Sequence, residues 1–543
     1  MGLMNLTIAD LFSKAVKRFG VETALVYRED SYTWKELDTL SNTVAVRLQT
    51  RGVCKGDHVG IWGQNSAAWL VTFLAVQKLG GICVLLNFNY RQRELIQAMS
   101  IGDVRWLCYG DTFALRENPG LIKSACSKFG QDYKDSFDIR EEALCLREML
   151  REEQSSPGPG PVELDCMETA CMLYTTGTTS DPKCVLHDHY SVVNNAIATV
   201  QKTGMNEWDV ICMSQPMFHV FTLNASILAS LYCGAALCLL SEFSSTEILE
   251  CIEKNKCTIL NGVPTNFLCL LSNQNFKKYS TRSLRLSIIG GANISEAQME
   301  YVRQSFPTVH IMRDYGLTEG CNLCNSDLTD SPKTVSRSVG QAYPNLELAI
   351  KDPVTGQILP AGQKGEIVTR GYNVMQGYYC SKYSRKDPPA SAIDEDGWLH
   401  TGDLGIIDRE GYVSLVGRIK DIIIRGGENI TPAEVSGEIL RYEPILDAVV
   451  VGVPHPLLGE EAAACLVLDI PEDYCESELR SLLKVRLARY KIPAFYLIYD
   501  SFPMKPNGKI DMLHLKQDAY DKVRKFHEGD ERYREMERYT APV

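Results

Sequence analysis

Short apolar runs of strand length alternate with segments of helix length along most of this 543-residue sequence. Residues 59–62 and 82–86 are typical of buried strands, and a helical segment from Trp69 to Leu79 lies between them. Strands that alternate with helices favour a parallel sheet whose faces are covered by those helices. The pattern therefore predicts an α/β fold.

Helix-start signals support this organisation. A helix with a normal cap is predicted after Thr7, and we prefer this to a mitochondrial presequence, which remains the alternative. Thr33 and Glu36 have the spacing of a capping box, which predicts a helix that ends at Gly52. A second box from Thr431 to Glu434 carries proline at its first helical position. The region 111–165 is predicted to be irregular.

The length of the chain argues for more than one domain. Glycine-rich strands and turns are predicted from 340 to 416, and after them comes a segment with its own strand, helix and strand order. A boundary near Lys420 is therefore predicted. It divides the chain into a large domain, residues 1–419, and a small domain, residues 420–543.

Composition narrows the functional classes. The net charge of -12 disfavours nucleic-acid binding, which needs a basic surface. The 19 cysteines show no repeated spacing and no secretory signal precedes them, so we expect reduced thiols in an intracellular compartment. Cys321 and Cys324 form a lone Cys-x-x-Cys pair and are expected to be structural. No apolar run reaches the roughly 18 residues of a membrane span, so no transmembrane segment is expected.

A polar loop between two β-prone runs carries the strongest functional signal. It combines small hydroxyl side chains, a glycine and a final Pro-Lys, so that N–H groups, hydroxyls and one cation converge where a polyanion would bind. Proline precedes the lysine where a Walker loop has glycine, so this is not a Walker loop. A plain turn is the alternative. The loop comprises Tyr174, Thr175, Thr176, Gly177, Thr178, Thr179, Ser180, Asp181, Pro182 and Lys183.

This loop resembles the phosphate-binding loop of the adenylate-forming enzymes, the family of acyl-CoA synthetases, carrier-loading adenylation domains and firefly-type luciferases. Further motifs follow in that family's order, and the resemblance extends from about Thr7 to Lys516. It implies a large N-terminal domain of stacked α/β subdomains with a β-rich subdomain. It also implies a small mobile α+β C-terminal domain.

The resemblance implies an ATP site in the large domain. Tyr315 would stack on adenine, Thr318 would contact phosphate, and Glu319 would hold Mg²⁺, which prefers carboxylate oxygen. Asp403 would accept hydrogen bonds from the ribose hydroxyls, with Arg418 as its partner. Other residues are assigned to the nucleotide site by their place in these motifs: Gly290, Gly291, Ala292, Asp314 and Gly316.

The resemblance assigns the remaining roles to the small domain. Lys509 would be the catalytic lysine, a compact cation that reaches the charge developing on the α-phosphate. Lys420 stands at the family's hinge position. Gly426 and Gly427 lie in a segment that resembles the loop closing on the pantetheine arm of coenzyme A, where glycine permits close backbone approach.

Two segments, 216–221 and 261–265, resemble the walls of the family's acyl pocket. His219, Phe221 and Gly262 are the candidate acyl-site residues. His219 would act as a gate, and a buried structural histidine is the alternative. Segments 56–66 and 425–434 are especially similar to medium-chain acyl-CoA synthetases.

A metal site at the His187-Asp188-His189 run is not expected, because no third ligand follows at a usable spacing, and His189 is predicted to be structural. The loop departs from the family at Ser180 and Cys184, which stand where the family has glycine. If φ is positive there, serine would cost roughly 1 kcal/mol of strain and weaken ATP binding.

The resemblance implies a two-step ligase that activates a hydrophobic carboxylic acid with ATP and Mg²⁺ and transfers it to coenzyme A. Loading of a carrier protein, or non-catalytic binding of a nucleotide or acyl-adenylate, are the alternatives. The acid's chain length stays open. A cytoplasmic location is favoured over a mitochondrial one, and the chain is expected to be a monomer or a homodimer.

Overall fold

The structure is a computed structural model that describes most of the chain. The described residues are 2–128, 133–140, 144–152, 158–160, 162–175, 182–292, 294, 296–381, 391–425, 428–455, 458–505 and 509–526. Within them the strands form four sheets. No helix in this described part is long and apolar enough to cross a membrane.

One sheet of seven strands has the order β18-β8-β7-β4-β3-β5-β6. The pairs among β3, β4, β5, β6 and β7 are parallel, and β8 and β18 continue the sheet in antiparallel pairs. The strands are β3 (His58–Trp62), β4 (Ile82–Leu86), β5 (Trp106–Tyr109), β6 (Asp135–Asp138), β7 (Thr169–Thr175), β8 (Lys183–Asp188) and β18 (Gly377–Tyr379).

A second sheet has nine strands in the order β15-β14-β13-β12-β11-β9-β10-β1-β2. Its central strands, from β13 to β1, pair in parallel. The strands are β1 (Thr23–Tyr27), β2 (Asp30–Thr33), β9 (Val210–Met213), β10 (Ala236–Leu239), β11 (Ile259–Gly262), β12 (Leu286–Ile289), β13 (His310–Leu317), β14 (Cys321–Asn325) and β15 (Gln341–Ala342).

Two smaller sheets follow in the sequence. The first has the order β16-β17-β19-β20 and contains β16 (Leu346–Lys351), β17 (Lys364–Gly371), β19 (Leu399–Ile407) and β20 (Val413–Arg418). The second lies wholly after position 420 and contains β21 (Ile423–Arg425), β22 (Glu428–Ile430), β23 (Ile445–His455), β24 (Gly459–Leu468) and β25 (Phe495–Tyr499).

The helices of the first half of the chain are α1 (Ile8–Phe19), α2 (Trp34–Thr50), α3 (Ala67–Lys78), α4 (Gln92–Ile101), α5 (Phe113–Glu117), α6 (Leu121–Cys126), α8 (Leu146–Glu152), α9 (His189–Thr203), α10 (Val220–Thr222), the π-helix η2 (Leu223–Leu228), α11 (Ala229–Cys233), α12 (Ser245–Asn255) and α13 (Pro264–Leu271). The later ones are η3 (Phe276–Lys278), α14 (Glu296–Ser305), α15 (Pro332–Arg337), η4 (Ile419–Asp421), α16 (Pro432–Ile439), η5 (Pro471–Asp473), α17 (Glu476–Arg486), η6 (Arg489–Lys491) and α18 (Met512–Phe526).

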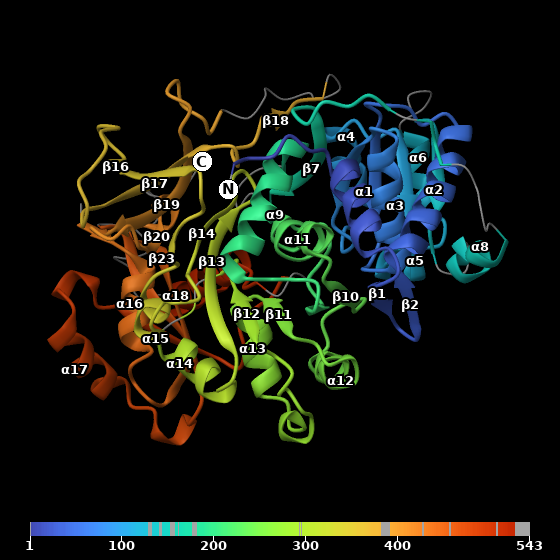
Figure 1. Ribbon diagram of the computed structural model, residues 1–543. Coiled ribbons are helices and arrows are strands. Elements are labelled where there is room, and N and C mark those ends of the chain that lie inside the picture. The colour runs from blue at the N-terminus through green and yellow to red at the C-terminus, as the bar shows by residue number, and fades with distance from the viewer. Residues whose placement is uncertain are drawn as a thin grey trace.

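The two large sheets are stacked with helices between them. Helix α9 contacts β7 and β8 of one sheet and β14 of the other, and Figure 1 shows it running between them. The largest apolar cluster joins α1, α2, α3, α9 and α11 to both sheets. Helices α4, α5 and α6 cover the far face of the seven-stranded sheet, and α12, α13 and α14 cover that of the nine-stranded sheet. The predicted α/β fold of stacked subdomains is therefore confirmed.

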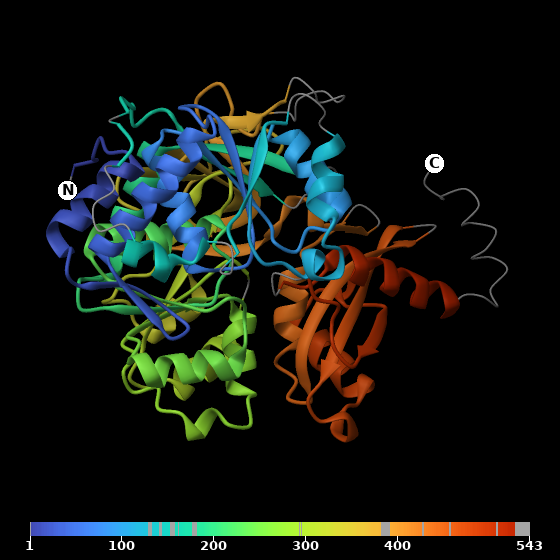
Figure 2. The same ribbon diagram turned by 90° about the vertical axis from the view of Figure 1, so that its right-hand side faces the viewer.

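The small C-terminal sheet and its helices form a separate α+β body beside the large one (Figure 2). Its two apolar clusters contain only residues from 423 onward, so this body has its own core. The strands predicted between 340 and 416 mostly form the four-stranded β-rich sheet, whereas β15 and β18 join the two large sheets. The exact boundary at Lys420 stays a prediction.

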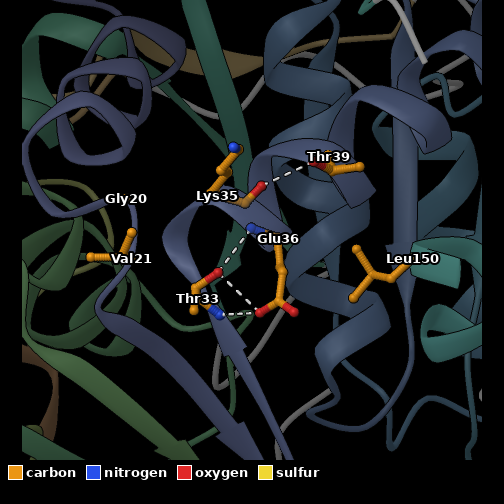
Figure 3. A pocket seen from close by; sticks show the side chains of 7 residues that line it. All are labelled: Gly20, Val21, Thr33, Lys35, Glu36, Thr39 and Leu150. Carbon is orange, nitrogen blue, oxygen red and sulfur yellow. Dashed lines mark hydrogen bonds between the residues drawn. The ribbon is translucent and has the colours of Figure 1, made fainter. Parts of the chain in front are cut away.

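Local capping signals had mixed outcomes. Thr7 and Thr33 each form the predicted capping box. Figure 3 shows Thr33 and Glu36 exchanging hydrogen bonds at the rim of a surface hollow of about 350 Å³. The second predicted box is wrong, because Thr431 makes no side-chain cap and Glu434 instead pairs with Lys491 at 2.6 Å.

The prediction that residues 111–165 are irregular is also wrong in part. This region contains α5, α6, α8 and the edge strand β6, which pairs in parallel with β5. Strand β6 carries the sequence DSFD, which has no apolar period, so its formation depends on the neighbouring strand rather than on its own pattern.

Candidate active site

The predicted phosphate loop joins two neighbouring strands. Strands β7 and β8 are antiparallel, and Thr175 is paired with Lys183, so the loop closes a hairpin as the sequence indicated. Thr175, Pro182 and Lys183 lie at its base. The residues at its tip lie outside the described part of the structure: Thr176, Gly177, Thr178, Thr179, Ser180 and Asp181.

Cys184 contradicts the expectation of backbone strain. It lies in the middle of regular β pairing, opposite Tyr174 on one side and Tyr379 on the other, and its φ is not positive. Its side chain is fully buried. Burial also raises the pKa of its thiol to about 12. Cysteine therefore fits this position as an ordinary strand residue, and only Ser180 retains the strain hypothesis.

The predicted ribose pair is formed. Asp403 on β19 lies opposite Arg418 on β20, and Arg418 Nε is 2.8 Å from Asp403 Oδ1. Tyr315 Oη donates to Asp403 Oδ2 over 2.8 Å. Asp403 and Tyr315 are each about 6% exposed, whereas half of the Arg418 side chain stays in solvent. A buried carboxylate with two ordered donors is thereby held at the edge where β13 meets the four-stranded sheet.

The predicted glycines gather at the carboxyl ends of parallel strands, the usual place for ligands in α/β sheets. Gly262 ends β11, and its carbonyl accepts a hydrogen bond from Gly290 N, just after β12, over 3.1 Å. A Cβ on Gly290 would lie 3.0 Å from the Asp314 carbonyl oxygen, a tight contact that favours glycine. Gly291 has φ +75°, where glycine is unstrained, and Ala292 follows it.

Asp314 lies behind these strand ends, at the bottom of the site. Its Oδ1 accepts hydrogen bonds from Tyr343 Oη and Asn325 Nδ2, each over 3.1 Å. Desolvation outweighs both and raises the pKa of this carboxyl to about 7. Its side chain is hydrogen-bonded within this buried network. We therefore expect Asp314 to contribute to ATP binding only by holding the end of β13 in position. Gly316 packs against the Cys321 carbonyl oxygen so closely that no side chain fits there.

The predicted metal and phosphate residues follow directly after β13. Glu319 Oε1 accepts a hydrogen bond from Tyr378 Oη over 3.0 Å. The Lys183 ammonium group lies 4.5 Å from the centre of the same tyrosine ring. Tyr378 therefore links the predicted phosphate loop to the predicted metal ligand, and the sequence analysis missed it. No local signal in the sequence marks Tyr378, because it lies on β18, almost 200 positions after β8, and is brought to the site only when β18 pairs with β8.

Thr318 is held through its backbone. Its carbonyl oxygen accepts a hydrogen bond from His187 Nε2 over 2.7 Å, and burial lowers the pKa of His187 to about 4. His189 is also buried, with Nδ1 accepting from Ile8 N over 3.2 Å. The predicted structural role of His189 is confirmed. Its hydrogen bond ties α9 to the start of α1, and that of His187 ties β8 to the segment after β13.

Lys509 of the small domain reaches this same site. A Cβ placed on Gly291 would be 3.9 Å from Lys509 Nζ. The side chain retains contact with solvent, but enough protein surrounds it for desolvation to lower its pKa, and the positive charge of Arg418 lowers it further. The predicted catalytic lysine thus lies beside the predicted nucleotide glycines, although more than 200 residues separate them in sequence.

Among the proposed acyl-pocket residues, His219 lies close enough to Lys509 to feel its charge. Desolvation, with a smaller effect of the Lys509 charge, lowers the pKa of His219 to about 3, so this imidazole is neutral at physiological pH. Its ring centre is 4.3 Å from that of Phe218. Phe221 lies in the short helix α10, which continues into the π-helix η2. Single π turns are frequent at functional sites.

Of the other small-domain residues with predicted roles, Lys420 lies in the described part of the structure and the two glycines do not. Lys420 lies in η4, exposed, between the last strand of the four-stranded sheet and the C-terminal body, and desolvation together with the charge of Arg418 lowers its pKa. Gly426 and Gly427 lie outside the described residues, between the paired strands β21 and β22. Arg425 anchors the start of that connection through Glu461 at 2.7 Å.

Comparison with known proteins identifies the chain's relatives. The AMP-binding enzyme family matches residues 12–379, and the AMP-binding enzyme C-terminal domain matches residues 434–509. The chain is 34% identical to YngI of Bacillus subtilis over 95% of its own length and 97% of that protein. It is 28% identical to the mouse (Mus musculus) protein named medium-chain acyl-CoA ligase ACSF2, mitochondrial, covering 95% and 88% of the two chains.

Solved structures agree with these sequence matches. The ATP-bound crystal structure of MatB from Rhodopseudomonas palustris superimposes with a TM-score of 0.84 at 27% identity, covering 96% of this chain and all of that one. A match of this extent includes both the large domain and the small one.

Proposed function

Because the chain belongs to the family of AMP-binding enzymes, we propose that it is an ATP-dependent ligase that joins a hydrophobic carboxylic acid to coenzyme A. One observation carries most of this proposal. Lys509 of the small domain lies beside Gly291, next to the buried Asp403 with its partners Tyr315 and Arg418. A protein that only bound nucleotide would have no need of a second domain that delivers a cation to this position.

In the first step, a carboxylate oxygen attacks the α-phosphorus of ATP. The new bond gives the acyl-adenylate, and the bond to the β-phosphate oxygen breaks to release pyrophosphate. We propose that Asp403 and Arg418 orient the ribose, and that Lys509 stabilises the negative charge on the α-phosphate. Lys509 lies beside Gly291 at the proposed nucleotide site, so its ammonium group is placed to meet an approaching phosphate.

A divalent cation fits the donor set at Glu319. Its carboxylate is oriented by the Tyr378 hydroxyl and lies just after β13, and hard Mg²⁺ prefers such oxygen ligands. When bound, Mg²⁺ would neutralise charge on the phosphates. We propose that Glu319 binds the metal ion and that Thr318 contacts a phosphate. Lys183 and the loop after β7 are proposed to bind the outer phosphates.

In the second step, the thiol sulfur of coenzyme A attacks the acyl carbonyl carbon. The carbon–sulfur bond forms, AMP leaves with the electrons of the acyl–oxygen bond, and the thiol proton passes to solvent. We propose that the small domain rotates about Lys420 so that Gly426 and Gly427 line the thiol's approach. His219, Phe221 and Gly262 are proposed to border the acyl chain.

The finer assignments belong to the same proposal. Relatives named as medium-chain acyl-CoA ligases favour a medium-chain acid. All 19 cysteines lie in the described residues and none of them forms a disulfide, which favours a reducing, intracellular compartment, with cytoplasm and mitochondrion as the two candidates. A monomer or a homodimer is proposed.

The test measures pyrophosphate release from ATP over a panel of fatty acids, with and without coenzyme A. We expect slow release of about one equivalent per enzyme without coenzyme A, and steady turnover to thioester with it. Turnover that requires a carrier protein instead would replace the coenzyme A assignment, and no release with any acid would contradict the ligase.

Lys509→Ala should lower the rate of acyl-adenylate formation about 10²–10³-fold, because the charge on the α-phosphate loses its stabilising cation. Thioester formation from supplied acyl-adenylate should change far less. The matched control is Lys516→Ala, which removes an exposed lysine of the same domain that pairs with Glu460 at 3.5 Å. Similar rates in the two variants would remove Lys509 from the mechanism.

A further inference from the structure

Four cysteines far from the proposed active-site residues meet in the core beneath the nine-stranded sheet. Cys212 on β9 and Cys238 on β10 are directly opposite each other in parallel pairing, so their side chains share one face of the sheet. Helix α12 covers this face and contributes Cys251, and Cys257 follows the helix. All four side chains are buried.

The turn after α12 brings the last of these cysteines back to the cluster. Lys256 caps the helix in the left-handed conformation, with φ +51°, and Cys257 N donates to Ile252 O over 3.1 Å. The Cys257 sulfur consequently lies 4.0 Å from that of Cys251. A left-handed lysine is uncommon, and here its effect is to turn a thiol toward the sheet.

The spacing of the sulfurs matches a metal–thiolate geometry. Those of Cys212, Cys251 and Cys257 all lie within 4.8 Å of one another, and Cys238 lies beside Cys212 on the neighbouring strand. In a tetrahedral zinc site with Zn–S bonds of about 2.3 Å, the sulfurs are about 3.8 Å apart. For these three sulfurs, closing each separation by at most about 1 Å would give the tetrahedral spacing.

We propose that Cys212, Cys238, Cys251 and Cys257 bind one zinc ion in a structural four-cysteine site. The ion forms four Zn–S bonds, and the four thiol protons are released to solvent. Tetrahedral coordination by four cysteines is a common form of structural zinc site. The proposal is independent of the ligase activity.

The surroundings of the four thiols disfavour a charged sulfur that has no bound cation. The neighbours are apolar, including Ile248, Ile252 and Leu260, so an uncompensated thiolate would be costly.

Two further features suit a metal site. Asn255 Nδ2 donates to the Cys251 sulfur over 3.5 Å, the type of second-shell hydrogen bond that orients a thiolate and offsets its charge. A cavity of about 710 Å³ is lined by both Cys238 and Cys251, together with Lys254 and Asn255, which gives an ion a route to the cluster. An ordinary apolar core of cysteines would need neither.

The expected consequence is local stabilisation. The ion would tie α12 to β9 and β10 and hold Cys257 two residues before β11 begins at Ile259. Strand β11 ends at Gly262, a proposed acyl-pocket residue. Metal binding that favours the folded state should raise the melting temperature of the large domain.

The first experiment uses the full chain purified under reducing conditions. Elemental analysis should find about one zinc ion per chain. Zinc-free protein titrated with Co²⁺ should develop the intense visible absorption of a tetrahedral cobalt–thiolate centre, and added Zn²⁺ should abolish it. Absence of both zinc and cobalt absorption would overturn the proposal, as would copper in place of zinc or a Cys251–Cys257 disulfide detected by mass spectrometry.

The second experiment uses variants. Cys251→Ala and Cys257→Ala should weaken Co²⁺ binding by more than about 100-fold, and Asn255→Ala by about tenfold. Cys108→Ala is the matched control, because Cys108 is equally buried on a strand of the other large sheet. It should bind Co²⁺ as the unaltered chain does. Equal binding by the control and both cluster variants would overturn the assignment, and the titration of the unaltered chain decides the matter if a variant does not fold.

Discussion

At the scale of single residues, the Asp314 carboxyl makes stability depend on pH. Its ordinary pKa is 3.8, and burial raises it to about 7 in the folded protein. Between these values the folded state binds more protons than the unfolded state at this site. Stability is therefore fully present below about pH 4 and declines as pH rises to 7, by up to about 4 kcal/mol.

Asp314→Asn should remove this pH-dependent loss, because the amide cannot ionise and can still accept from Tyr343 and Asn325. Urea unfolding at several pH values measures the difference between the variant and the unaltered chain. We expect nearly equal stability at pH 4 and a more stable variant at pH 8. A difference that does not change with pH would show that Asp314 titrates normally.

Tyr378 offers a second prediction at this scale. Tyr378→Phe removes the hydroxyl that donates to Glu319 but keeps the ring against Lys183. If Glu319 holds Mg²⁺, the apparent affinity for Mg²⁺ in the adenylation assay should weaken by about 10-fold. Tyr379→Phe, one position along the same strand, is the control. No change in Mg²⁺ dependence would argue against this positioning role.

At the scale of elements, strand β8 shows how a departure from a family pattern is accommodated. Cys184 replaces a glycine in the family pattern and fills a buried position between β7 and β18. Glycine is unfavourable inside strands, where it has no side chain to pack. The cysteine is therefore expected to stabilise the base of the phosphate loop.

Cys184→Gly should lower the free energy of unfolding by about 1–3 kcal/mol and leave the Michaelis constant for ATP unimproved. Cys184→Ala separates the effect of the lost side chain from that of the added backbone freedom. Its free energy of unfolding should lie between those of the unaltered chain and Cys184→Gly. Denaturant unfolding and ATP titration of the adenylation rate measure these effects. A several-fold tighter ATP constant in Cys184→Gly would restore the strain hypothesis at this position.

At the scale of the whole molecule, the two domains meet with Lys509 at the proposed nucleotide site. If Lys509 acts on the α-phosphate as proposed, this is the arrangement that adenylation needs. Thioester formation would require the small domain to turn, and η4 with Lys420 lies on the chain segment that connects the two bodies.

Lys420→Pro should restrict this segment, because proline fixes φ near about -65°. We expect acyl-adenylate formation in a single turnover to stay within about threefold, and thioester formation to fall about tenfold or more. Lys420→Ala removes the charge but leaves the backbone at this position free to rotate. It should keep the rates of both half-reactions closer to those of the unaltered chain. Equal loss in the two half-reactions of Lys420→Pro would place the hinge elsewhere.

The parts that the sequence determined by itself depend on interactions over a few positions. The strands at 59–62 and 82–86 and the helices capped by Thr7 and Thr33 form where their patterns predict. The order of the nucleotide motifs was likewise readable, because each motif is a short run of residues.

Tertiary structure decided what depends on distant partners. Glu434 pairs with Lys491 rather than capping its own helix, and Tyr378 joins the site through β18. The four-cysteine cluster depends on strand register and on the left-handed turn at Lys256. Register and helix docking are set by burial of whole faces, and a local pattern in the sequence carries no record of which faces will meet.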